Sequence, residues 1–180
     1  MNEQFAEKNI NTLETNLTTG ADPNLAVTTI PDSVQDYLGI ADALYRYGTG
    51  IDLNDAALFA SAFSENAVVD FSAVARKLGL ELPPLLIGGE NIVQHIISVA
   101  GPHTTTHVVT NPRIRVEGDT AKMLALVEAT HLPPDDHSRH CLMKNRYDVD
   151  LIRDGKDWRI CRLTIDTTWF TGDPQVLLSK

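Results

Sequence analysis

The chain has 180 residues, a formal net charge of -9 and a pI near 5.0. This length suits one domain with a short extension, and the 43% of hydrophobic residues can supply a substantial core. Because no block of Lys and Arg interrupts the acidic balance, we expect neither nucleic acid nor a membrane surface as a partner.

The two cysteines, Cys141 and Cys161, have neither metal-ligand spacing nor a disulfide-rich pattern. They predict reduced thiols in a cytoplasmic protein. The N-terminal sequence lacks a basic region followed by an apolar run, and no later segment is apolar for long enough to span a bilayer. We therefore expect a soluble protein.

Three helices are predicted in the first part of the chain, after an extension or arm at residues 1–31 that is rich in Asn, Thr and Glu. The first helix begins after Asp32 or Ser33 as N-cap and ends near Asp52. Its apolar stripe consists of Val34, Tyr37, Leu38, Ala41, Leu44, Tyr45 and Gly48. "NDAALFASAF" predicts a second, short helix, and "GENIVQHIISVAG" predicts a third. Residues 73–88 contain a Pro-Pro pair and stay unassigned.

The strands are predicted from alternating apolar and polar residues. "NAVVDFS" predicts one strand, and four long alternating runs after residue 103 predict an antiparallel meander of four strands. Helices followed by such a meander indicate an α+β domain over residues 32–172, with a C-terminal tail at residues 173–180. If the sheet curls around the helices, the natural binding site is the pocket between them.

Strand parity indicates which side chains point into that pocket, because residues two apart share one face of a strand. His107, Val109 and Asn111 share a face in the first run of the meander. In the second run His131 lies on the same face as three small or apolar residues, Ala125, Val127 and Ala129. In the third run the apolar face carries Cys141, Met143, Asn145, Tyr147, Val149 and Leu151. Two imidazoles, an amide and a phenol can therefore point inward.

Asp52 follows the apolar stripe of the first helix, next to Gly48 and Tyr45 on the helical wheel. A buried carboxylate without a donor would cost several kcal/mol or become protonated, so we expect Asp52 to find one. The obvious donor is a histidine. A carboxylate bonded to one ring nitrogen fixes the tautomer and raises the basicity of the other nitrogen, which makes a general base.

Three stretches, "YRYGTGIDLNDAALFASAFSENAVVDF", "THVVTNPRIRVEGDTAKM" and "YDVDLIRDGKDWRICRL", resemble the SnoaL-like branch of the nuclear transport factor 2-like superfamily. The resemblance covers residues 33–170. It implies a cone-shaped α+β barrel, in which a curved antiparallel sheet and three N-terminal helices close a deep apolar pocket. It also implies a cofactor-independent lyase or isomerase, such as a dehydratase, that acts on a small hydrophobic ring-containing molecule.

The resemblance assigns roles by position. Asp52 matches the acid that orients the catalytic base, His107 matches that base, and His131 matches a second site histidine. Tyr47 matches a family tyrosine, although on an ideal helix it lies off the Asp52 face. The candidate catalytic residues are thus Asp52, His107, His131 and Tyr47, and the candidate substrate-binding residues are Asn145, Tyr147, Phe71 and Val127. The chain departs from the dehydratases of the family at Ile51 and Phe71, where those enzymes have water-binding tyrosines.

Other interpretations remain open. Asp52 could be a solvated residue at a helix end, and His107 could be a hydrogen-bonded core histidine. The pocket could serve a hydrolase or polyketide cyclase, or the fold could be a non-catalytic ligand-binding or assembly module. His103 and His107 in "HTTTH" lie on extended chain, where no helical turn brings them together, so we expect no metal site.

We expect no cofactor, and we expect two kinds of partner. One is a small hydrophobic ligand. The other is the chain itself, as a homodimer or homotrimer, because a curved sheet leaves one broad face to be covered.

Overall fold

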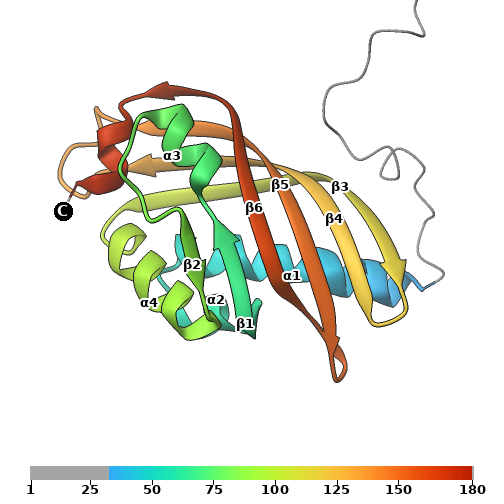
Figure 1. Cartoon of the computed structure of the whole chain (residues 1–180). Helices are drawn as coiled ribbons and strands as arrows, with labels where there is room; N and C mark the ends of the chain where they lie inside the picture. Colours follow the sequence, from blue (N-terminus) through green and yellow to red (C-terminus); the bar gives the residue numbers. More distant parts are fainter. Residues whose placement is uncertain (1–32, 180) are drawn as a thin grey trace, which may run out of the picture.

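The computed structural model describes residues 33–179, so the predicted arm at residues 1–31 lies outside the described residues (Figure 1). Helix α1 (Val34–Asp52) begins at Ser33, whose side chain accepts a hydrogen bond from the backbone N–H of Asp36. Ser33, rather than Asp32, is therefore the N-cap. Helix α2 (Ala56–Ser61) begins in the same way at Asp55, which accepts from the N–H of Leu58.

The sheet has six strands in the order β2-β1-β6-β5-β4-β3. Its larger part is the predicted meander: β3 (Thr104–Glu117), β4 (Thr120–Leu132), β5 (Cys141–Asp154) and β6 (Asp157–Gly172), each antiparallel to the next. These long strands curve over α1, and α4 (Gly89–Ala100) lies at one end of the curve (Figure 1). The predicted α+β cone is confirmed.

Two details of that prediction need correction. The sheet is mixed rather than antiparallel, because β1 (Phe63–Asp70) runs parallel to β6, and β2 (Leu85–Ile87) then adds to β1 as an edge strand. The described residues also contain four α-helices rather than three. The additional helix, α3 (Ser72–Leu78), lies in the segment that the sequence left unassigned and ends at Gly79, which has a left-handed φ of 67°.

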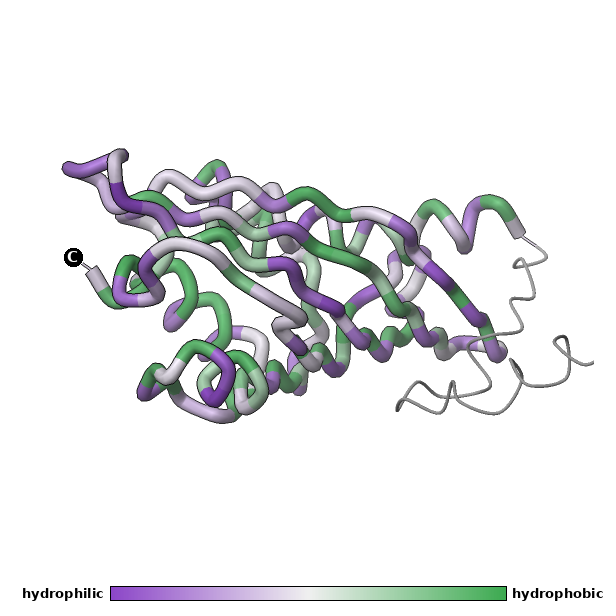
Figure 2. Tube along the Cα trace, turned by 90° about the horizontal axis from the view of Figure 1, so that it is seen from above, coloured by the Kyte–Doolittle hydropathy of each residue, from purple (hydrophilic) through white to green (hydrophobic). Residues whose placement is uncertain are grey.

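Parity holds for most of the meander and fails at one position. The expected inner residues of β4 and β5 are buried except His131, which is half-buried, and polar and apolar residues alternate along the tube of the long strands (Figure 2). In β3 the register shifts between Thr110 and Arg113, where Asn111 has a φ of 53°. Asn111 is therefore exposed and does not share the inner face of His107, and Ile114 is the next fully inward residue.

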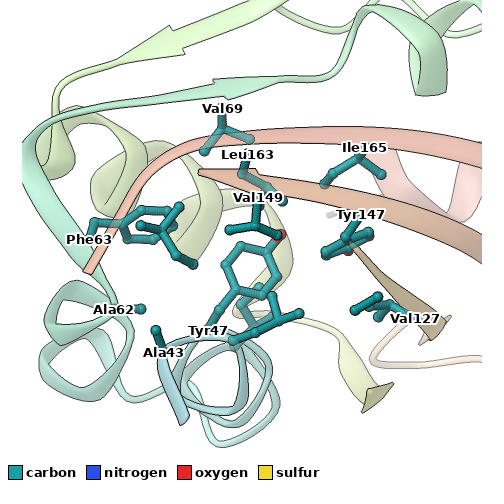
Figure 3. Packing of buried hydrophobic residues seen from close by; sticks show 14 of the residues in the cluster. Ala43, Tyr47, Ala62, Phe63, Val69, Val127, Tyr147, Val149, Leu163 and Ile165 are labelled. Carbon is teal, nitrogen blue, oxygen red and sulfur yellow. The ribbon is translucent and has the colours of Figure 1, made fainter. Parts of the chain in front are cut away.

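The buried face of α1 also differs from the predicted stripe. Ile40, Leu44, Tyr47 and Ile51 are buried, whereas Val34, Leu38 and Tyr45 are exposed. The helix lies along the concave side of the sheet, so two adjacent rows of its residues are buried. The first row contains the four buried residues named above, and the second contains Ala41 and Gly48 and ends at Asp52. Figure 3 shows the ring of Tyr47 extending from α1 toward strand β5, which carries Tyr147 and Val149.

The last described residues, predicted as a tail, contain the 3-10 helix η2 (Pro174–Leu178). Val176 of this helix is fully buried in the core. None of the helices between residues 33 and 179 has both the length and the apolar character that crossing a membrane requires.

Gly48 sets how closely α1 approaches β3. A Cβ atom added at Gly48 would lie 2.9 Å from the Cβ of His107, a separation that side chains do not normally reach. We expect Gly48→Ala to push the helix away from the strand and to lower the free energy of unfolding by about 1 to 3 kcal/mol, although alanine is the better helix former. Urea denaturation measures this change.

The control is Gln35→Ala on the exposed side of the same helix, which should change the free energy of unfolding by less than about 0.5 kcal/mol. If Gly48→Ala were as stable as wild type, the close approach would not be a constraint on the fold.

Candidate active site

Asp52, the last residue of α1, binds strand β3 through three hydrogen bonds. Its Oδ1 accepts from the hydroxyl of Thr105 at 2.8 Å and lies 2.6 Å from Nδ1 of His107. Its Oδ2 accepts from the backbone N–H of His107 at 2.7 Å. The predicted pair of Asp52 and His107 is therefore present at hydrogen-bond distance, and the carboxylate is held by both the side chain and the backbone of its partner.

The surroundings of Asp52 favour its charged form. Partial burial raises the pKa of the carboxyl group, but the hydrogen bond and charge of His107, the Thr105 hydroxyl and the His107 backbone N–H lower it more, so that the pKa lies below its ordinary value. Asp52 is consequently ionised at neutral pH. A carboxylate at Nδ1 selects the tautomer in which that nitrogen carries the proton, which leaves a lone pair on Nε2 of a neutral imidazole.

The His107 side chain lines a cavity of about 130 Å³, and only 4% of it is exposed to solvent. The Asp52 side chain is 22% exposed and is not among the described residues that form the cavity wall. The base candidate thus lines the cavity, and its carboxylate partner does not. Apolar residues dominate the remaining wall, including Ile51, Phe71, Ile96, Ala129, Met143 and Ile165.

Two predicted phenols meet in this cavity. The rings of Tyr47 and Tyr147 lie edge to face with centroids 5.9 Å apart, and their side chains share a hydrogen bond. Burial raises the pKa of Tyr47 to about 12 and raises that of Tyr147 well above its usual value. Both phenols therefore keep their protons at neutral pH. Because one hydroxyl donates to the other, one O–H of the pair is left to donate to a ligand. The expected displacement of Tyr47 from the site is not observed, because the buried face of α1 centres on it.

His131 also lines the cavity, with its ring centroid 5.7 Å from that of His107 and 6.5 Å from that of His103. Burial first, and then the neighbouring His107 and His103, lower the pKa of His131 to about 3, although Asp52 acts in the opposite direction. His131 is therefore a neutral polar group at neutral pH.

The predicted substrate-binding residues divide into two groups. Phe71, Asn145 and Tyr147 line the cavity. Val127 is 1% exposed and is not among the described residues that line the cavity, so its expected role in substrate binding stays a prediction.

The sequence analysis missed part of the cavity wall. Val74, Leu82 and Pro83 come from the unassigned segment, and Leu177 comes from the predicted tail. His95 and His103 also line the cavity. His103 could have been found, since it shares strand parity with Thr105 and His107.

His103 fastens the C-terminal segment beside the cavity. Its Nδ1 lies 3.0 Å from the carbonyl oxygen of Val99, and its Nε2 lies 2.7 Å from the carbonyl oxygen of Val176. The Ser179 hydroxyl lies 3.0 Å from the same Nε2. Within residues 33–179, no three His, Cys, Asp or Glu side chains are grouped so that they could hold a metal ion.

Comparison with known proteins shows the family to which this chain belongs. Residues 32–164 match the SnoaL-like domain family. The terrestric acid biosynthesis cluster protein E of Penicillium crustosum is 29% identical over 160 residues, which cover 85% of this chain and 96% of that protein.

Two solved structures show the same fold. A proposed aromatic ring hydroxylase from Novosphingobium aromaticivorans superposes with a TM-score of 0.70 and 26% identity, covering 81% of this chain and 98% of that one. A hexachlorocyclohexane dehydrochlorinase from Novosphingobium barchaimii superposes with a TM-score of 0.63 and 19% identity, covering 76% of this chain and 89% of that one.

The low pKa of His131 predicts a pH-dependent stability. The unfolded chain protonates this histidine below its ordinary pKa of 6.5, whereas the folded protein protonates it only near pH 3. The unfolded state thus binds the extra proton, so the contribution of His131 to stability is complete above pH 6.5 and decreases as the pH falls toward 3. From pH 7 to pH 5 this contribution should decrease by about 2 kcal/mol.

Urea denaturation of wild type and His131→Asn at pH 7 and pH 5 isolates this contribution, because the other titrating groups are common to both proteins. The variant should lose less stability on acidification. Equal losses would show that His131 is protonated as readily in the folded protein as in the unfolded chain.

Proposed function

Because this chain belongs to the SnoaL-like domain family, we propose that it is a cofactor-independent lyase or isomerase for a small, hydrophobic, ring-containing molecule. His107 is the general base and Asp52 orients it. The observation that carries the proposal is the 2.6 Å contact between Asp52 Oδ1 and His107 Nδ1, behind an imidazole that lines an apolar cavity.

The proposed reaction begins with proton transfer from a substrate carbon to Nε2 of His107. Asp52 stabilises the imidazolium that forms, because its negative charge lies at the opposite ring nitrogen. The electron pair of the broken C–H bond forms a C=C bond, and a leaving group on the adjacent carbon departs with its own bonding pair. The proton on His107 then passes to the leaving group. In an isomerisation no group leaves: the electron pair of the C–H bond moves into a neighbouring double bond of the substrate, and the proton returns to another carbon of the same molecule.

Protonated groups near the base can assist the departure. Both phenols keep their protons, and the hydroxyl of Tyr47 or Tyr147 that does not donate within the pair can donate a hydrogen bond to an oxygen or halogen leaving group. His131 is neutral and lies next to His107, so it can bind the same group without repelling the imidazolium. We assign these three residues to leaving-group binding and proton return.

The size of the cavity limits the substrate. An engineered protein cavity of about 150 Å³ binds benzene, and the cavity here is about 130 Å³. A single ring with small substituents therefore suits this site better than a polycyclic molecule. Two relatives support small-molecule chemistry: one is described as a biosynthesis cluster protein, and the other, which shares the fold, as a dehydrochlorinase.

The proposal predicts a large difference between two variants and wild type. With single-ring probes such as 3-hydroxycyclohexanone and chlorocyclohexane, Asp52→Asn should lower the elimination rate by about 10² to 10⁴, and His107→Ala should abolish it. Release of cyclohexenone is followed by ultraviolet absorbance, and release of cyclohexene by gas chromatography.

The matched control is Asp42→Asn, which changes an exposed aspartate of the same helix and should leave the rate unaltered. Circular dichroism checks that both aspartate variants fold. Wild-type rates in Asp52→Asn would contradict the proposed role of the carboxylate. Tight binding of the probes without turnover would favour the non-catalytic binding module.

A further inference from the structure

Asn145 and Thr167 form a buried polar pair in an otherwise apolar region. They face each other across β5 and β6, each is 3% exposed, and the Thr167 hydroxyl donates to Asn145 Oδ1 at 2.8 Å. Asn145 lines the cavity, whereas Thr167 is outside the wall that the described residues form. Thr167 can therefore contact Asn145 but not a ligand.

This hydrogen bond fixes the orientation of the Asn145 amide. An asparagine side chain has one acceptor oxygen and one NH₂ group with two donors. Since Thr167 engages the oxygen, the NH₂ group is turned away from β6. Within residues 33–179, Nδ2 of Asn145 has no hydrogen-bond partner. Every side-chain nitrogen or oxygen that is closed off from solvent in this range does have a partner, so Nδ2 is not closed off. The amide N–H groups of Asn145 consequently face the cavity.

Asn145 and His107 project from different strands of the same concave surface. His107 pairs with Ala129, and Asn145 pairs with Val127 on the same strand, so Asn145 lies two strands away from His107 and two residue pairs further along the sheet. Two strand spacings and this offset along the strands separate their backbones by about 12 Å. Their side chains can therefore contact two ends of a single-ring molecule.

We infer that the substrate carries a carbonyl oxygen that accepts a hydrogen bond from Asn145 Nδ2, and that Thr167 is the positioning residue that orients this donor. The inference rests on the proposed function and narrows its substrate class to cyclic ketones or related carbonyl compounds. A ligand without a hydrogen-bond acceptor binds such a cavity less well, because it displaces water from the Asn145 amide and leaves that donor without a partner.

The chemistry agrees with this substrate class. When His107 takes a proton from the carbon next to a carbonyl, the electron pair of the C–H bond moves toward the carbonyl oxygen, where Asn145 stabilises the developing charge. The electrons then return to form a C=C bond, and the leaving group on the next carbon departs with its bonding pair. The product is an α,β-unsaturated carbonyl compound, and the proton on His107 passes to the leaving group.

The test uses an isosteric pair of probes, cyclohexanone and methylenecyclohexane, and measures the dissociation constant of each by calorimetry. Loss of one hydrogen bond of about 1.4 kcal/mol should raise the ratio of the ketone constant to the alkene constant about tenfold in Asn145→Leu. Thr167→Val should raise this ratio in the same direction, and Thr167→Ser, which keeps the hydroxyl, should retain the wild-type ratio.

Two further measurements separate positioning from general damage. The C=O stretching frequency of bound ¹³C-labelled cyclohexanone should be lower in wild type and Thr167→Ser than in Asn145→Leu and Thr167→Val. Thr168→Val, which changes the exposed threonine next to Thr167 outside the cavity wall of the described residues, should leave both the frequency and the ratio near their wild-type values.

The inference fails if the ratio and the frequency are the same in wild type and Asn145→Leu, or if wild type binds neither probe. Measuring the ratio also in His107→Ala keeps this result distinct from that of the proposed reaction. A ratio that still depends on Asn145 in that background would support the donor site even if no elimination is found. Elimination that depends on His107 without such a ratio would overturn the substrate inference alone.

Discussion

The attachment of the Asp52 carboxylate to strand β3 is the interaction on which the rest of the site depends. Three hydrogen bonds, from the Thr105 hydroxyl and from the ring and backbone of His107, join the end of α1 to the first strand of the meander. They can form only because Gly48, one turn earlier, lets the helix backbone approach His107 closely. A carboxylate in this position fixes the helix, the imidazole tautomer and the direction of the second ring nitrogen together.

The rest of the cavity is built around that ring. The curved meander supplies one wall, and α4, α3 and the C-terminal 3-10 helix supply apolar side chains around it. Four of the polar groups in the cavity wall have a defined state: the two phenols keep their protons, His131 is neutral, and Asn145 is oriented by Thr167. An apolar cavity with a few oriented polar groups is the usual form of a small-molecule site.

Much of this arrangement follows from the sequence, for identifiable reasons. A side-chain period of two predicts which residues of β4 and β5 point inward, and an acid beside an apolar helical stripe predicts a buried partner for Asp52. The prediction of the elements failed where a local backbone conformation, or a partner strand distant in the sequence, determines the structure. The Asn-Pro pair at 111 and 112 forms a bulge that ends the parity of β3. The parallel pairing of β1 with β6 has no local signal, and α3 has seven residues and no side-chain cap.

The state of the two ring nitrogens of His107 tests the account most directly. Long-range ¹H–¹⁵N NMR of the histidine rings distinguishes a protonated nitrogen from one with a lone pair. We expect the neutral tautomer with the proton on Nδ1, a strongly downfield resonance for that proton because of its bond to Asp52, and loss of this pattern in Asp52→Asn. A proton on Nε2 in the wild-type protein would contradict the account, because the nitrogen that faces the cavity would then have no lone pair with which to remove a proton.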